Sequence, residues 1–270
     1  MGDQTGAVVG RHLGSKDGHL WLASVKGNQF LNDTLILDDT FDDIQGMEAG
    51  EGKKAWIFGN SGRSDISKKG NIWVTEIDKN AKIGKTKIIS TKGKYNTLYA
   101  SGHDYRGNLL LAGEISNVKK DPWIIELSPD REILFEQEID LNQNNKANSV
   151  LKSFRGERWV TVISESGGYR SPEPHYSIVL AEGDTFQKEP LKIVDSEKFQ
   201  IKKLLEIGLD TFIIAGTMQD KSGNDKNLRV VCVTYKDLIA ENNSGSKSKG
   251  EIVLDSPYVY KNFRVSAANK

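Results

Sequence analysis

Two short patterns of hydrophobic and polar residues recur along the chain at intervals of about 50 residues. The first pattern is a run of apolar residues that ends in glycine, a composition that suits a β-strand. The second is an apolar strand, begun by tryptophan in its clearest copies, that starts 10 to 14 residues after the glycine position. The first pattern occurs as GAVVG (6–10), AWIFG (55–59), LLLAG (109–113), WVTVI (159–163, with Ile163 in the glycine position) and FIIAG (212–216). The tryptophan position of the second pattern is filled by Trp21, Trp73, Trp123, Ser177 and Arg229.

The stretch 70–89 shows how each unit continues. Ile72, Val74 and Ile88 are β-branched residues that suit strands, and Asp78 opens a polar turn between them. The same strand, turn and strand return after the other glycine positions. A fourth strand is expected between one unit and the next. The candidates for it are 43–49, 97–102, 149–154, 201–207 and 261–267.

An all-strand unit repeated at this interval is typical of propeller blades. We therefore predict an all-β, five-bladed β-propeller of four-stranded antiparallel blades, forming a single domain over residues 1–270. The chain begins with the second strand of its first unit and ends with an unmatched first strand. We expect residues 261–267 to pair with residues 6–13 and close the ring, which removes open sheet edges. The Gly/Ser/Lys-rich segment 241–251 is expected to be a hairpin loop before the last strand of the fifth unit.

The units resemble the bacterial propeller repeat called the delta-60 type. The residues that carry this resemblance are Leu111-Ala112-Gly113 with Trp123-Ile124-Ile125-Glu126-Leu127, and Ile57-Phe58-Gly59 with Trp73-Val74-Thr75-Glu76-Ile77-Asp78. It is weaker in the fourth and fifth units, and Glu76 and Glu126 stand where the family has lysine. What it implies is an architecture often found in surface or secreted bacterial proteins. The motif has no catalytic residues to carry over.

Composition narrows the classes of function. Lys plus Arg and Asp plus Glu both number 37, so the formal net charge is zero, which argues against nucleic acid as the main partner. The single cysteine excludes an internal disulfide and lies in the apolar run VVCV. No apolar run is long enough for a transmembrane segment. The compartment is not determined by these features. An extracytoplasmic location, with a leader removed from the N-terminus, agrees with the resemblance.

The aromatic and acidic residues suggest two kinds of site. The phased tryptophans could form a sugar platform, but their fixed position in each unit favours packing between blades. The segment 38–43 offers Asp38, Asp39, Asp42 and Asp43, and paired carboxylates could hydrolyse glycosides. The equivalent loops of the other units have Asn96, Asn148, Gln200 and Lys261, so no opposing acid is evident. A solvated acidic loop or a weak cation site is the preferred interpretation.

Motifs for metals and cofactors are weak throughout the sequence. Segment 220–227 lacks the order and the final glutamate of a calcium loop. The four histidines show no zinc-binding spacing, and no nucleotide-binding glycine pattern or serine-nucleophile motif follows a strand. We therefore expect no catalytic residues, no metal and no cofactor.

The loops of one face depart most from the repeat, and departures from a repeat are where a rigid scaffold carries function. Loops 60–71, 164–175 and 218–227 share this face with the connections that lead into each first strand. Aromatic residues recur in those connections, either as caps on the blades or as part of a recognition surface. The predicted binding residues are Arg63, Tyr95, Tyr169, Arg170, His175, Phe199 and Tyr260.

From these patterns we predict a non-catalytic binding propeller that recognises a protein or a glycan partner through this face. An inhibitor or immunity-type protein is one variant of this prediction. The alternative is a carbohydrate-active hydrolase of the five-bladed propeller type. A hydrolase requires two converging carboxylates, whereas a binder requires aromatic and arginine anchors.

Overall fold

A computed structural model of the chain describes most of its strands and the turns between them. The described residues are 5–12, 19–26, 29–36, 43–50, 54–61, 71–78, 80–89, 95–116, 119–141, 144–154, 158–165, 175–183, 185–186, 191–193, 199–219, 226–236 and 251–252. They form two compact units, the first made of Met1–Lys120 and Ile125–Glu136, the second of Asp121–Ile124 and Gln137–Lys270. Each unit is considered by itself below.

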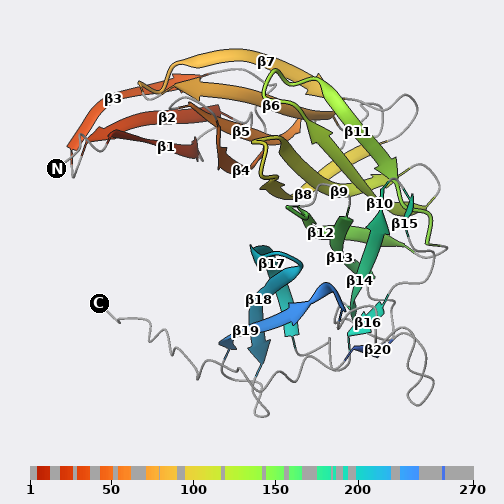
Figure 1. The fold of residues 1–270 in the computed structure, drawn as a ribbon. Helices are drawn as coiled ribbons and strands as arrows, with labels where there is room; N and C mark the ends of the chain where they lie inside the picture. The colour runs from red at the N-terminus through yellow and green to blue at the C-terminus, as the bar shows by residue number, and fades with distance from the viewer. Residues whose placement is uncertain are drawn as a thin grey trace. The chain divides into compact units, whose positions relative to one another are not determined.

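The first unit contains three antiparallel sheets whose strands follow one another in sequence (Figure 1). The first sheet has three strands, β1 (Thr5–His12), β2 (His19–Lys26) and β3 (Gln29–Ile36). The second sheet is β4 (Asp43–Ala49), β5 (Lys54–Ser61), β6 (Asn71–Asp78) and β7 (Ile83–Ile89). The third sheet is β8 (Tyr95–His103), β9 (Leu109–Ser116), β10 (Lys120–Leu127), a strand shared between the two units, and β11 (Ile133–Glu138).

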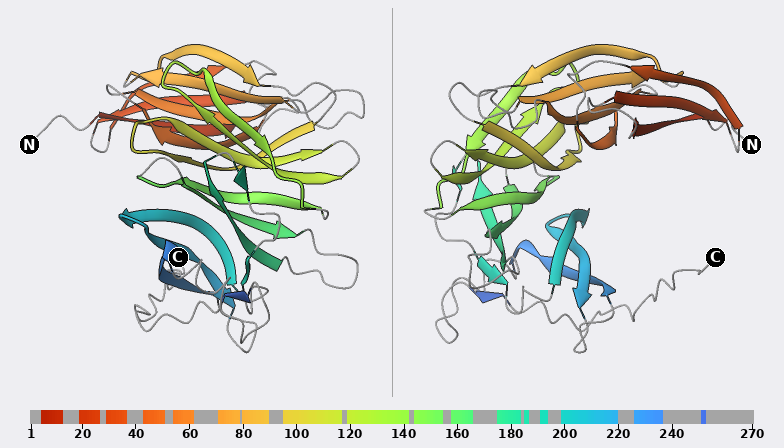
Figure 2. Two further views of the ribbon diagram at one scale, coloured as in Figure 1. Left: turned by 45° about the vertical axis from the view of Figure 1, so that its right-hand side comes forward. Right: turned by 180° about the vertical axis from the view of Figure 1, so that it is seen from behind.

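The second unit contains two further sheets in the same chain order, which the colours of Figure 2 also follow. One is β12 (Asn145–Lys152), β13 (Arg158–Glu165) and β14 (His175–Glu182), extended by the short strands β15 (Thr185–Phe186) and β16 (Leu191–Ile193). The other is β17 (Phe199–Gly208), β18 (Thr211–Gln219) and β19 (Lys226–Thr234). The prediction of an all-β chain with five antiparallel sheets is thus confirmed.

One strand departs from the prediction. The short strand β20 (Glu251–Ile252) pairs in parallel with β16 of the fourth sheet, through Lys192 to Glu251 and Ile193 to Ile252. The sequence analysis placed the chain after 241–251 in the fifth sheet, and this expectation is wrong for these two residues. A three-residue strand such as β16 leaves an open edge, and an open edge accepts whichever strand reaches it. Residues 261–267 lie outside the described residues, so the ring closure and the single domain stay predictions.

The two sequence markers face each other across the second and third strands of a sheet. Gly10 pairs with Trp21, and Gly59 pairs with Trp73. A Cβ atom on Gly59 would lie 2.7 Å from Cζ2 of Trp73, so the indole occupies the space that the glycine leaves. In the fourth sheet the equivalent cross-strand pair is Ile163 with Ser177. The large residue is now on the second strand and the small one on the third, the reverse of Gly59 and Trp73. The weaker fourth repeat therefore keeps the complementary packing of the pair.

The phased tryptophans are structural in the second and third sheets. Trp73 and Trp123 are fully buried, and Trp73 packs with Leu20, Leu22 and Ile57 in a core between the first two sheets. Trp21, whose fixed position also favoured a packing role, is only partly buried. Its sheet has three described strands rather than four, and its ring meets Phe30, which is 66% exposed.

The glycine position also lets the first strand of a sheet come close to the second. A Cβ on Gly113 would overlap the carbonyl oxygen of Thr97, and one on Gly216 would overlap that of Gln200. We expect Gly113→Ala to lower the free energy of unfolding by about 3 kcal/mol, because the backbone of β8 must move away. Gly208→Ala, where a Cβ meets nothing within 4 Å, is expected to change it by less than about 0.5 kcal/mol. Urea unfolding of both variants measures the difference, and equal costs would contradict this reason for the glycine.

Candidate functional site

A β-bulge interrupts the first strand of every sheet that has a described strand in that position. The extra residue lies between Ile44 and Gly46 in β4 and between Leu98 and Ala100 in β8, and β12 and β17 are interrupted at the same phase. A bulge releases one residue from the alternation of the strand and changes the direction of its side chain. The bulged residues are Gln45, Tyr99, Asn148 and Lys202.

Three of these bulged side chains contact a polar residue at the same end of their own sheet. Gln45 Nε2 donates a hydrogen bond of 2.7 Å to Oδ2 of Asp43. The Tyr99 hydroxyl is hydrogen-bonded to the Glu114 carboxylate. Asn148 Nδ2 donates a bond of 2.6 Å to Oγ of Ser164. The polar groups at this end of the sheets are therefore held by side chains from the bulges.

Asn60 connects the second sheet to the third at this end. Its Oδ1 accepts a hydrogen bond of 2.7 Å from the Leu98 amide, and its Nδ2 lies 3.3 Å from the Leu98 carbonyl oxygen. The same Nδ2 also donates to Oδ2 of Asp43 at 3.4 Å. Leu98 pairs with Gly113, the residue before Glu114. The side-chain amide of Asn60 thus connects the Asp43 carboxylate to β8 of the third sheet, next to the β9 residues Gly113 and Glu114.

Glu114 has a cation and a phenol as partners. Its Oε1 lies 2.9 Å from Nζ of Lys120, which is half-exposed, whereas Glu114 itself is only 5% exposed. Burial, the charge of Glu114 and the hydrogen bond to it together raise the pKa of Tyr99 to about 12. Asp43, by contrast, is half-buried and receives only neutral amide donors among the described residues, both on Oδ2. We call Asp43, Asn60, Tyr99, Glu114 and Lys120 the carboxylate site.

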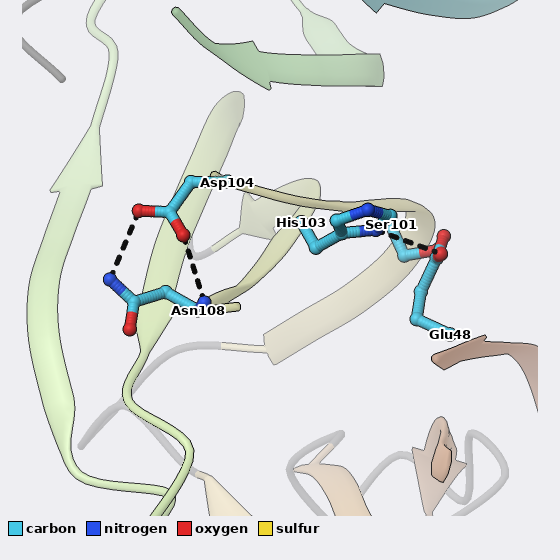
Figure 3. Close-up of polar contacts among 5 residues, drawn as sticks. All are labelled: Glu48, Ser101, His103, Asp104 and Asn108. Atoms are coloured by element: carbon cyan, nitrogen blue, oxygen red, sulfur yellow. Dashed lines mark hydrogen bonds and ion pairs between the residues drawn. The ribbon is translucent and has the colours of Figure 1, made fainter. Parts of the chain in front are cut away.

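A second polar cluster lies at the opposite end of the same first strands (Figure 3). Ser101 donates a hydrogen bond of 2.8 Å to Oε1 of Glu48, and Nδ1 of His103 lies 3.5 Å from Oε2. The carboxylate stands between the hydroxyl and the imidazole. A nucleophilic triad requires the imidazole in the middle, so this cluster does not activate Ser101. Its contacts join β4 to β8.

The turn after β8 is also held by polar contacts rather than arranged for chemistry. Oδ1 of Asp104 accepts hydrogen bonds of 2.9 Å from the amides of Arg106 and Asn108. The Asn108 amide group then donates to Asp104 and, at 2.8 Å, to the buried Glu126 (Figure 3). These bonds satisfy the backbone donors of a tight turn, which is an ordinary structural role for aspartate.

A further buried carboxylate in the second unit has a similar role. Glu206 accepts hydrogen bonds from the amide of Phe154 at 2.6 Å and the amide of Asp210 at 3.3 Å. Burial raises the pKa of Glu206. The side chain connects β17 to the end of β12 by satisfying two backbone donors, so it is a structural acid.

The structure describes only some of the predicted binding residues. Tyr95 is the first residue of β8, is 38% exposed and lies at the same end as Asp43. His175 and Phe199 begin β14 and β17, but their side chains are not among those described. The predicted loops and the remaining binding residues lie outside the described residues, so this binding surface stays a prediction. Those remaining residues are Arg63, Tyr169, Arg170 and Tyr260.

The acidic segment contributes one described residue, since Asp43 opens β4 whereas Asp38, Asp39 and Asp42 lie outside the description. The sequence analysis found no acid to oppose it. Glu114 is a carboxylate at this end of the neighbouring sheet that the comparison of loops did not consider, because it stands in a second strand rather than in an inter-strand loop. The available signal was its position directly after Gly113, at the end of the glycine-ending pattern.

In the described part of the chain, no three His, Cys, Asp or Glu side chains gather around one point. Within the same residues, no helix has both the length and the apolar character needed to span a membrane.

Comparison with known proteins gives structural likeness only. No protein family and no curated protein matches the sequence. A GH43 β-1,3-galactosidase matches with a TM-score of 0.48 and 12% identity over 84% of this chain and 56% of that one. A xylan β-1,4-xylosidase from Bacillus halodurans C-125 matches with a TM-score of 0.44 and 12% identity over 87% and 51%. This chain thus spans about half the length of these two enzymes.

An exo-1,5-α-L-arabinanase from a bovine ruminal metagenomic library matches with a TM-score of 0.43 and 8% identity, over 85% of this chain and 93% of that one. The names of these similar structures are those of enzymes that act on carbohydrate, which corrects our prediction of a non-catalytic binding propeller. That prediction is therefore not carried further. No substrate and no catalytic residue is transferred from these enzymes to this chain.

Proposed function

We propose that the chain is a carbohydrate-active hydrolase that cleaves glycosidic bonds at the carboxylate site. The observation that carries the proposal is the placement of Asp43 and Glu114 at one end of two neighbouring sheets, joined through Asn60 and Leu98. Glycoside hydrolysis requires two carboxyl groups on opposite sides of the scissile bond.

The two carboxyl groups have unlike surroundings, as acid and base roles require. The Lys120 ammonium contacts Glu114, which suits the carboxylate that accepts a proton. Both amide donors to Asp43 reach Oδ2, so Oδ1 is the oxygen that can carry a proton to the leaving group. We assign Asp43 as the general acid and Glu114 as the base.

The direct test is hydrolysis of a panel of aryl glycosides and plant polysaccharides by the purified chain, followed as released nitrophenol and reducing sugar. We expect cleavage by the wild-type protein and its loss in Asp43→Asn and Glu114→Gln. If both variants cleave as fast as the wild-type protein, the activity lies elsewhere and the assignment of the carboxylate site is wrong.

We also propose that residues 261–267 complete the first sheet and close the ring. Among the described residues, the first sheet has three strands, β1 to β3, where the second and third have four. The fourth strand of that sheet would be supplied from the C-terminal segment, whose composition suits a strand. The pairing would cover the free edge of β1.

We expect truncation after Pro257 to lower the melting temperature strongly and to cause aggregation, because an uncovered apolar edge strand pairs with other chains. A shorter truncation that removes only 268–270 leaves the proposed strand in place and serves as the control. Thermal melts and size-exclusion chromatography measure both effects. Equal behaviour of the two truncated proteins would count against ring closure.

A further inference from the structure

Of the two hydrogen-bonded groups Tyr99 and Glu114, the tyrosine is the one that meets solvent. Tyr99 is 37% exposed, whereas Glu114 is 5% exposed and is hydrogen-bonded to the tyrosine hydroxyl. A molecule that approaches from solvent can therefore contact the tyrosine side chain, whereas Glu114 is almost entirely covered. Glu114 needs an intermediary if it is to exchange a proton with a substrate.

The backbone places Tyr99 in this position by the bulge in β8. Leu98 before it is fully buried and pairs with Gly113, and Ala100 after it pairs with Ala112, so the register shifts at Tyr99. The bulge frees the side chain from the alternation of buried and exposed positions. At the same phase, Gln45 binds Asp43 and Asn148 binds Ser164, so the bulged residue in three sheets contacts the polar group at this end.

We propose that Tyr99 is a catalytic residue of the hydrolysis and relays a proton from the attacking water to Glu114. This inference rests on the function proposed above and names the group at that site that touches the reacting water. The water oxygen bonds to the anomeric carbon while the bond from that carbon to the leaving oxygen breaks. Tyr99 takes the proton of the water and gives its own proton to Glu114, and Asp43 gives its proton to the leaving oxygen. Solvent later returns one proton from Glu114 to Asp43.

The ionisation of Tyr99 agrees with this role. Its pKa of about 12 keeps the hydroxyl protonated at neutral pH, so the residue passes on a proton only when it receives one. Lys120, which lies 2.9 Å from Glu114, holds the carboxylate that accepts this proton. The relay needs no metal and no cofactor.

The test compares Tyr99→Phe, Glu114→Gln and the double variant on the glycoside that the wild-type protein cleaves best. We expect each single change to lower kcat by about 10²-fold or more with a smaller effect on KM, and the double change to lower it no further. The limb of the kcat profile against pH that reports the base should disappear in each variant. Tyr105→Phe, in a 48% exposed tyrosine of the turn after β8, is the matched control and should retain wild-type kcat.

A measurement without substrate tests the contact itself. Tyrosine ionisation is followed by ultraviolet absorbance in Glu114→Gln and in Glu114→Gln with Tyr99→Phe, and the difference isolates Tyr99. Its pKa should fall below about 12, because the charge of Glu114 is gone while burial remains. An unchanged pKa would overturn the coupling of the two groups.

The outcomes separate the inference from the proposed function. If Glu114→Gln is inactive but Tyr99→Phe keeps wild-type kcat, Glu114 acts directly and the relay is wrong, while the hydrolase stands. If the fold-loss of kcat in the double variant equals the product of the two single losses, the residues act independently and the relay is also wrong. A wild-type protein that cleaves no glycoside overturns the proposed function and the inference with it.

Discussion

Asp43→Asn and Glu114→Gln are each expected to lower kcat for glycoside hydrolysis by about 10²- to 10⁴-fold, the usual contribution of a positioned acid or base. Both changes keep the size of the side chain and remove its ability to exchange a proton. An asparagine at position 43 still offers an oxygen to the amides of Gln45 and Asn60. Steady-state kinetics over a range of pH should show the loss of one limb of the profile in each variant.

The matched control is Glu48→Gln, a carboxylate on the same strand as Asp43 but at its opposite end, where it binds Ser101. We expect this variant to retain kcat, since its role is to join β4 and β8. Melting temperatures of all three variants show whether a loss of activity reflects unfolding. If Glu48→Gln loses activity but keeps the wild-type melting temperature, our placement of the site is wrong and the site lies at the other end of the strands.

Trp73→Ala and Trp123→Ala are each expected to lower the free energy of unfolding by about 3–5 kcal/mol, the cost of deleting a fully buried indole. The cavity left by Trp73 lies against Leu20, Leu22 and Ile57, and it cannot close without moving two sheets. Trp21→Ala is expected to cost less, because this tryptophan is only partly buried and packs on the exposed Phe30. Urea unfolding at one temperature gives the three values.

An equal loss in all three tryptophan variants would contradict the difference in burial between the sheets. A truncated chain offers a further check. If residues 261–267 cover the first sheet, Trp21→Ala should have a smaller effect once those residues are removed, because the side chain then has less contact to lose.

The regularity of the repeat made the strands predictable from the sequence. The interval of the glycine and tryptophan positions located the second, third and fourth strands of most sheets, and the gaps between them located β4, β8, β12 and β17. This succeeded because the spacing reflects local requirements. Position 59 must be glycine because a Cβ there would overlap the ring of Trp73 and the backbone of β4. It also explains why the fourth unit looked weak, since Ile163 and Ser177 meet the same requirement with the sizes exchanged.

The site depended on contacts that the spacing does not contain. The bulges at Gln45 and Tyr99 arise from the pairing register of two strands, and one sequence shows no register directly. In the sequence Glu114 looks like an ordinary strand residue. Its site depends on the hydrogen bond from Tyr99 of β8 and on the bond that joins Asn60 of the second sheet to Leu98. The sequence comparison did not consider Glu114 for this reason, because it compared only equivalent loops.

What the sequence determined by itself is the repeated unit, because side-chain size and strand propensity act between residues a few positions apart. What only the tertiary structure decided is which polar groups meet at the end of the sheets and which edge β20 joins. Those choices depend on contacts between separate sheets, where a hydrogen bond or an open edge is satisfied by whichever residue the packing brings within reach.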